Sequence, residues 1–130
     1  MEPGWLTAAT VVEINRREVA RTGEPFGLLR PALLESAVAS PRNLFAYSGE
    51  RALPVLAARL LFGIAPNHPF AQGNKRAAFT ASVVFLRSKG RRVAPPDDPS
   101  IADLVIAVIE GSRTEAEFIA AMTPHLAAPA

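Results

Sequence analysis

Apolar side chains recur at helical spacing in stretches of roughly 10 to 16 residues, and glycines and prolines stand between these stretches. The alternation of apolar and polar residues that is typical of β-strands is almost absent, and no internal repeat is present. The pattern therefore predicts an all-α fold. A chain of 130 residues is long enough for one core, since folding at this length buries about two-thirds of the unfolded surface. We expect a single domain over residues 1–130, a bundle of about six helices.

Helix caps and stops place the expected helices. Thr7 and Thr10 are candidate caps for the first helix, and Gly23 ends it. Thr114 and Glu117 have capping-box spacing at the start of the last helix. The expected helices cover residues 7–22, 31–39, 52–64, 75–89, 100–111 (with Ser100 as its cap) and 114 onward to Pro124. Those over 52–64 and 75–89 should be the two central helices.

A proline and two aromatic residues mark the segment after the second helix. Pro41 should close that helix, because proline inside a helix removes a hydrogen bond and clashes with the preceding turn. Beyond it, aromatic residues stand two apart and Gly49 follows, which favours a short extended flap over residues 41–50. The flap candidates are Leu44, Phe45, Ala46 and Tyr47. The alternative is that Phe45 and Tyr47 merely pack on the bundle.

Composition and charge limit the compartment and the partners. The chain has no cysteine, which excludes thiol catalysis and a disulfide framework and fits a reducing compartment, so we expect a cytoplasmic protein. No stretch has the features of a secretory signal peptide or the length of a membrane span. A net charge of +2 at pH 7 predicts no specific nucleic-acid surface and no membrane partner.

The residues suited to chemistry gather just before and at the start of the second central helix. Gly73 permits a tight backbone turn, and the amides that open the following helix are unpaired donors at the positive end of its dipole. Asn74 adds a neutral donor there, and Lys75 and Arg76 add two cations at an end where the dipole disfavours them. We interpret these four residues as an anion-binding site.

His68 lies a few residues before this anion-binding site. Its imidazole can accept a proton near neutral pH, so a base stands beside a phosphate site, the outline of phosphoryl or nucleotidyl transfer. Phe70 would anchor the loop in the core. Taken one by one, these residues are better explained by structural roles, as parts of a Pro-flanked loop and a Gly-Asn turn.

The string HPFAQGNKRA resembles the signature of the Fic/Doc superfamily: His, any residue, Phe, any residue, Asp or Glu, Gly, Asn, Lys or Gly, Arg. The matching residues are His68, Pro69, Phe70, Gly73, Asn74, Lys75 and Arg76. The flanking segments LLESAVASPRNLFAY and FLRSKGRRV resemble the death-on-curing (Doc) branch, so the resemblance covers nearly the whole chain. It implies a small all-α bundle with the motif between two central helices.

The resemblance also implies an activity, ATP-dependent transfer to a hydroxyl of a target protein, with Mg²⁺ held at the acidic motif position. The implied roles are His68 as base, Gly73, Asn74, Lys75 and Arg76 as phosphate ligands, and Phe70 as loop anchor. The Doc branch implies a toxin of a toxin–antitoxin pair that phosphorylates elongation factor Tu and is held in check by a small antitoxin. Residues 44–47 align with the flap that pairs with the target segment in the superfamily.

Two positions bear on which activity the resemblance implies. Phe79 stands three residues after Arg76, where the AMP-transferring Fic branch carries a second arginine, and this favours a kinase over an AMP transferase. Gln72 stands at the acidic position, and its amide oxygen offers Mg²⁺ a ligand without charge. Gln72 is therefore a candidate metal ligand of reduced charge. A Fic/Doc-fold binding module that lacks catalytic activity remains an alternative.

The terminal helices have thin apolar stripes or are interrupted by Pro124, so they should cover the helix over residues 52–64 incompletely. We expect an apolar groove there. The resemblance implies that a helix of the antitoxin fills it, and a second copy of this chain is the alternative occupant.

Overall fold

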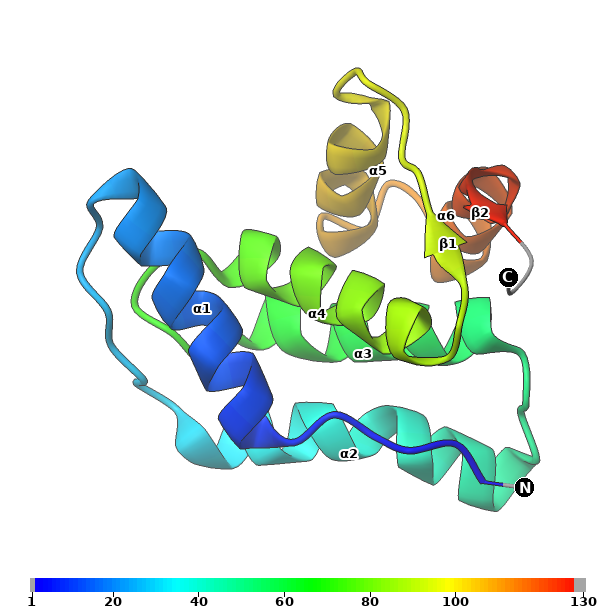
Figure 1. Ribbon diagram of the computed structural model, residues 1–130, viewed down its shortest axis with the longest axis horizontal. Helices are drawn as coiled ribbons and strands as arrows, with labels where there is room; N and C mark the ends of the chain where they lie inside the picture. The colour runs from blue at the N-terminus through cyan, green and yellow to red at the C-terminus, as the bar shows by residue number, and fades with distance from the viewer. Residues whose placement is uncertain (1, 128–130) are drawn as a thin grey trace.

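The computed structural model describes residues 2–127, which form six α-helices joined by short connections (Figure 1). The helices are α1 (Ala8–Thr22), α2 (Pro31–Ser48), α3 (Leu53–Ile64), α4 (Asn74–Ser88), α5 (Ser100–Ile109) and α6 (Glu115–Met122). Short 3₁₀ turns, η1 (Ala65–Asn67) and η2 (Thr123–His125), follow α3 and α6. The strands β1 (Arg92–Val93) and β2 (Leu126–Ala127) pair antiparallel, Arg92 opposite Ala127. The all-α bundle predicted from sequence is confirmed.

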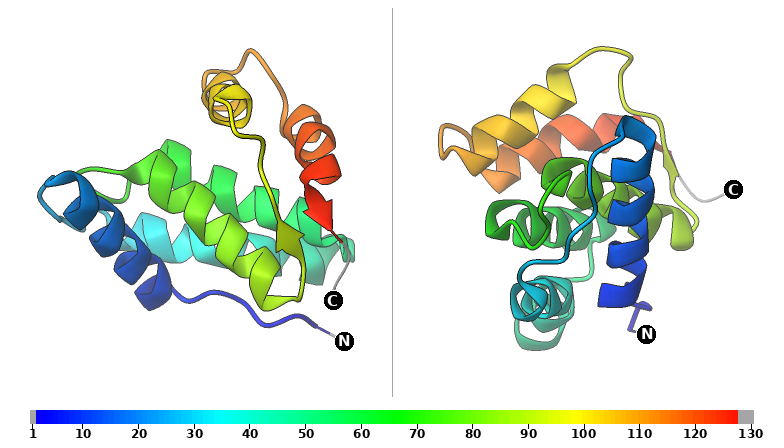
Figure 2. Two further views of the ribbon diagram at one scale, coloured as in Figure 1. Left: turned by 45° about the horizontal axis from the view of Figure 1, so that its top comes forward. Right: turned by 90° about the vertical axis from the view of Figure 1, so that its left-hand side faces the viewer.

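The helices are stacked in layers around α3 and α4 (Figure 2). α2 packs on one side of α3, α5 and α6 lie on the other side of the α3–α4 pair, and α1 crosses α4. The largest fully buried side chains include Leu56, Leu60 and Leu61 of α3 and Phe85 of α4. The two central helices expected from sequence are therefore the core of the molecule. No helix within residues 2–127 has the length and apolar character needed to cross a lipid bilayer.

Helix caps explain where the outer helices begin. Thr7 caps α1 by accepting a hydrogen bond from the N–H of Thr10, so Thr7 rather than Thr10 is the cap. The predicted capping box at Thr114 and Glu117 opens α6. Ser100 was expected to cap α5, and this is wrong: Ser100 is the first residue of the helix and Pro99 is its N-cap, while the N–H of Ser100 donates to Oδ1 of Asp98 at 2.9 Å.

The second helix does not stop at Pro41. α2 runs through this proline to Ser48 and ends at Gly49, in the left-handed region with φ of 74°. Proline at position 41 leaves the carbonyl of Ala37 without its helical donor. That carbonyl faces Gly63 of α3, where a Cβ atom would lie only 3.3 Å from the oxygen. Because Gly63 has no side chain, the turn of α2 that precedes Pro41 fits closely against α3. This packing keeps α2 continuous.

The predicted extended flap over residues 41–50 is therefore wrong in its position. Leu44, Phe45, Ala46 and Tyr47 are helical; the Phe45 ring contacts the Trp5 ring edge-on at 5.8 Å between centroids, and Tyr47 is 88% exposed. The extended segment of the fold lies instead between α1 and α2, over residues 24–30. There Leu28 forms an isolated antiparallel bridge with Phe70.

Candidate active site

The loop between α3 and α4 begins with a histidine in an unusual backbone conformation. His68 ends η1 with φ of 46° and ψ of 57°, and it is the one residue other than glycine with positive φ in the part of the chain that the structure describes. Its carbonyl oxygen accepts a hydrogen bond of 2.7 Å from Nη1 of Arg30. The His68 side chain is exposed to solvent. The backbone of this residue is thus held by Arg30, just before α2, while its imidazole is free to meet a ligand.

Phe70 and Asn74 close the loop. Phe70 is 1% exposed, as expected for the anchor, and its ring lies 6.4 Å from that of Phe26. The Asn74 side chain accepts from the N–H of Phe70 and donates to its carbonyl, both at 2.9 Å. Because both polar atoms of this side chain are occupied, the group that Asn74 offers an anion is its backbone N–H at the start of α4.

The extended segment over residues 24–30 runs along the outer side of the same loop. The N–H groups of Leu29 and Arg30 donate to the carbonyl of Pro69 at 2.8 and 3.0 Å, and the N–H of Ala71 donates to the carbonyl of Gly27 at 2.8 Å. These bonds attach the loop to the connection between α1 and α2. The loop is consequently fixed on both sides, by Asn74 and by this segment.

Gly73 makes the close approach of the loop to α1 possible. Its φ is 70°, and a Cβ atom there would lie 3.2 Å from Cγ1 of Val19, so both conformation and space require glycine. Gly73 is also the N-cap of α4, and no side chain caps this helix. The first N–H groups of α4 therefore face outward as donors, at the positive end of the helix dipole.

A shallow depression of about 420 Å³ brings the motif together. Its lining residues are His68, Ala71, Gln72, Gly73, Asn74, Lys75 and Arg76. All predicted motif residues except the buried Pro69 and Phe70 thus meet at one surface. The predicted flap residues 44–47, on the C-terminal half of α2, are not among them.

Arg76 has partners that the sequence did not indicate. Its guanidinium forms an ion pair with Glu24, and its Nη1 lies 3.3 Å from the Thr22 hydroxyl. Hydrogen bonds from Thr22 first, and from Arg76 second, lower the pKa of the Glu24 carboxyl. Glu24 is 52 residues from Arg76 in the chain, and no local pattern links them. The sequence indicates only that the first helix ends at Gly23, directly before Glu24.

The donor set of the depression does not fit a protein-held magnesium ion. Mg²⁺ is usually bound through one or two carboxylates, and no Asp or Glu lines the depression. Gln72 is exposed there, and its backbone carbonyl oxygen accepts a hydrogen bond of 2.8 Å from Nδ2 of Asn15. Within residues 2–127, no three His, Asp or Glu side chains gather as a metal site. The groups that this surface offers an anion are the cations Lys75 and Arg76 and the N–H groups at the start of α4.

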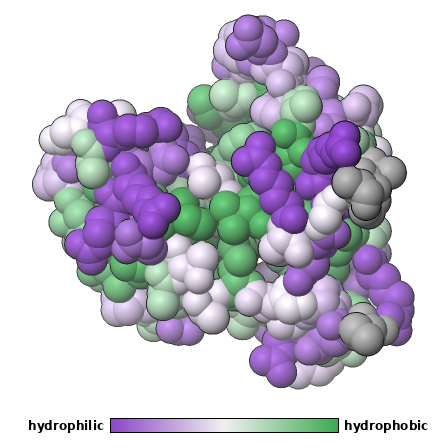
Figure 3. Space-filling model, viewed as in Figure 1, coloured by the Kyte–Doolittle hydropathy of each residue, from purple (hydrophilic) through white to green (hydrophobic). Residues whose placement is uncertain are grey.

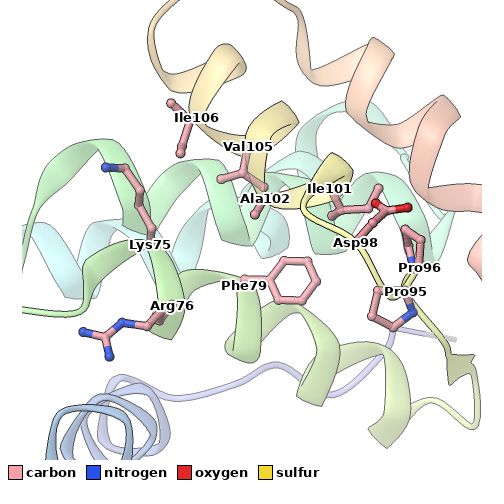
Figure 4. A pocket seen from close by; sticks show the side chains of 10 residues that line it. All are labelled: Lys75, Arg76, Phe79, Pro95, Pro96, Asp98, Ile101, Ala102, Val105 and Ile106. Atoms are coloured by element: carbon pink, nitrogen blue, oxygen red, sulfur yellow. The ribbon is translucent and has the colours of Figure 1, made fainter. Parts of the chain in front are cut away.

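An apolar cavity of about 340 Å³ adjoins the depression between α4, the loop before α5, and α5 itself (Figure 4). Lys75 and Arg76 line both, and Phe79, Ile101 and Val105 form much of the apolar wall. Figure 3 shows apolar surface at the middle of this face, flanked by hydrophilic surface over α1. The groove was predicted over α3, and this is wrong, because residues 56–64 except Arg59 are buried by the neighbouring helices.

Comparison with known proteins agrees with this geometry. The model of the Fic/DOC family matches residues 5–86. Among curated proteins, the chain is 28% identical over 101 residues to "Protein kinase doc" of Escherichia phage P1, covering 78% of this chain and 79% of that protein. The match includes α1, nearly all of α4 and the whole motif loop, so every residue that lines the depression lies within it. The chain therefore belongs to the Fic/DOC family.

Proposed function

We propose that this protein transfers the γ-phosphoryl group of ATP to a hydroxyl of a target protein. The observation that carries the proposal is that His68 and the uncapped start of α4 line one depression, so a base and a phosphate-binding surface face the same ligand. The similarity to a relative named a protein kinase supports phosphate as the group transferred. Magnesium enters with ATP, bound to its phosphates.

In this reaction the chain's residues have separate tasks. The imidazole of His68 accepts the proton of the target hydroxyl, whose oxygen forms a bond to the γ-phosphorus while the bond to the bridging oxygen breaks. ADP leaves with that electron pair, and the proton stays on His68. Lys75, Arg76 and the N–H groups that open α4 stabilise the charge on the phosphate oxygens. Phe70 and Asn74 keep the loop in place.

We assign the role of target-binding flap to the extended segment over residues 24–30, in place of residues 44–47. Leu28 and Leu29 are 36% and 58% exposed there, beside the loop that begins with His68. A target segment packed on these side chains would bring its hydroxyl near His68. Residues 44–47, helical and remote from the depression, are not part of this proposal.

Two other activities have an observation in their favour. The open site also suits transfer of AMP, but the position three residues after Arg76 holds Phe79, whose ring lines the apolar cavity (Figure 4) and offers no charge to a second phosphate. A catalytically inactive binding module is favoured by Gln72 and by the absence of any carboxylate from the depression's lining.

Transfer of label separates the three activities. The purified chain is incubated with magnesium and elongation factor Tu, the target that the family resemblance implies, and with ATP labelled at either the α- or the γ-phosphorus. Label from the γ position alone is the expected result. Label from the α position alone would establish AMP transfer, because the γ-phosphorus then leaves in pyrophosphate, and no label on any tested target would favour the binding module. His68→Ala is the matched control.

The apolar cavity suggests how such a toxin would be restrained. We propose that a helix of a small antitoxin fills it, with acidic residues placed against Lys75 and Arg76, which also line the depression. An occupant of the cavity would then compete with ATP. Light scattering of the chain, alone and with the product of any adjacent small gene, tests this. A monomer that binds no such product, or a homodimer, would contradict it. A cytoplasmic location is part of the same proposal.

A further inference from the structure

A buried asparagine on α1 contacts the backbone of the motif loop. Asn15 is 0% exposed, and its Nδ2 donates to the carbonyl of Gln72 at 2.8 Å. Its Oδ1 is also buried and has no hydrogen-bond partner within the described residues. An unpaired buried polar atom is costly for stability. An apolar side chain of the same size would avoid that cost, so the residue at this position is not explained by packing.

The hydrogen bond fixes the direction of one peptide unit. No peptide bond among the described residues is cis, and in a trans peptide the C=O and the following N–H point in opposite directions. Because the Gln72 carbonyl points at Asn15, the N–H of Gly73 points away from Asn15. This N–H has no acceptor within residues 2–127. Gly73 itself lines the depression.

The orientation matters because of the residues that follow. Gly73 is in the left-handed region, with φ of 70° and ψ of 24°, and α4 begins at the next residue. Successive N–H groups of a left-handed residue followed by a right-handed one converge on a common point, and such concavities bind anions. Rotation of the Gln72–Gly73 peptide would remove the first donor from this set and place a carbonyl oxygen there.

We propose that Asn15 is a positioning residue that, by holding the Gln72 carbonyl, adds the N–H of Gly73 to the phosphate-binding donors of α4. The proposal rests on the proposed function only in taking the depression as the phosphate site. Asn15 touches no ligand and acts through Gln72.

The experiment compares two buried positions of α1, using inorganic pyrophosphate as the probe. Asn15→Leu keeps the branched shape and the number of side-chain heavy atoms and removes the donor. Val11→Ala, one turn earlier and 0% exposed, disturbs the packing of α1 without contacting the loop. Titration calorimetry of pyrophosphate and thermal melting are measured for both. In addition, the Gly73 amide resonance of the unmodified chain is followed as pyrophosphate is added.

We expect Asn15→Leu to bind pyrophosphate about tenfold or more weakly, the loss of one hydrogen bond to a charged group, with little change in melting temperature. Val11→Ala should melt earlier and bind pyrophosphate as the unmodified chain does. The Gly73 amide should shift on titration together with those of Lys75 and Arg76. A merely structural asparagine would lower the melting temperature and leave affinity unchanged, and that result would overturn the proposal.

Other outcomes also test the role proposed for Asn15. A Gly73 amide that stays still while those of Lys75 and Arg76 move would overturn the proposal even if Asn15→Leu fails to fold. Failure of the unmodified chain to bind pyrophosphate would overturn it too. A chain that binds pyrophosphate in this pattern but transfers no phosphate would contradict the proposed function alone.

Discussion

Replacement of Asn74 tests whether this residue serves the loop or the ligand. In Asn74→Ala both hydrogen bonds to Phe70 are lost, and a buried N–H and C=O are left without partners. Each bond contributes about 1 kcal/mol net, and a buried group left unpaired costs about 1–3 kcal/mol, so we expect a loss of roughly 2–4 kcal/mol in the free energy of unfolding. At about 4 °C per kcal/mol for a chain of this length, the melting temperature should fall by roughly 8–16 °C.

The companion variants separate the two bonds and the charge. Asn74→Asp keeps the acceptor for the Phe70 N–H, loses the donor to the Phe70 carbonyl, and places a negative charge at the start of α4, which the helix dipole favours by about 0.3–1 kcal/mol. Its melting temperature should therefore lie between those of Asn74→Ala and the unmodified chain. Lys75→Ala, at an exposed neighbouring position, should change stability by less than about 0.5 kcal/mol.

Thermal melting followed by circular dichroism gives the stabilities, and calorimetry with pyrophosphate, well below the melting transition, gives the affinities. Lys75→Ala should lose affinity and keep stability, whereas Asn74→Ala should show the reverse pattern. If Asn74→Ala melts with the unmodified chain and binds pyrophosphate tenfold more weakly, the side chain is a ligand and the loop-closing role assigned to it is incorrect.

Three substitutions, two in the depression and one at the partner of Arg76, give four further predictions. His68→Ala should abolish label transfer while lowering the melting temperature by only a few degrees, because the side chain is exposed and the change costs roughly 1 kcal/mol; full activity would refute His68 as the base. Gln72→Glu should make ATP binding tighter in magnesium than in chelator, and an affinity equal in both would place this side chain outside the metal's reach. Glu24→Gln should tighten pyrophosphate binding by removing a negative charge beside Arg76, whereas Glu13→Gln, the same charge change at an exposed site on α1, should not. Hydrogen bonds from Thr22 first and Arg76 second lower the pKa of Glu24 in the folded protein, so the stability that they provide is present above the ordinary carboxyl pKa and is lost as pH falls through the lowered one. Glu24→Gln should flatten this acid limb of the melting profile, and an unchanged limb would refute it.

Local signals were enough to predict most of the helices. The caps at Thr7 and Thr114 and the stop at Gly23 act within one turn of their own residues, so the sequence contains all that determines them. The motif from His68 to Arg76 is contiguous, and its convergence on one depression followed from the same locality.

The errors arose where distant residues decide the structure. Pro41 ends a helix in isolation, but Gly63 on another helix accommodates the turn it disturbs. The extended segment was misplaced because its pairing partner is the motif loop, some forty residues away, and not a neighbouring strand. The sequence did not predict the contacts of Asn15 and Glu24 with the motif for the same reason, since both contacts form only after α1 has docked against α4.

The bond between Asn15 and Gln72 also sets an order of events during synthesis. These residues are 57 positions apart, and at about 5–20 residues per second a ribosome needs roughly 3–11 s to make the intervening chain. Throughout that interval α4, the helix that packs against α1, has not yet been made. The nascent chain thus has no assembled site during this time. A chain with this architecture therefore cannot bind a ligand at the motif until α1 and the loop before α4 have both been synthesised.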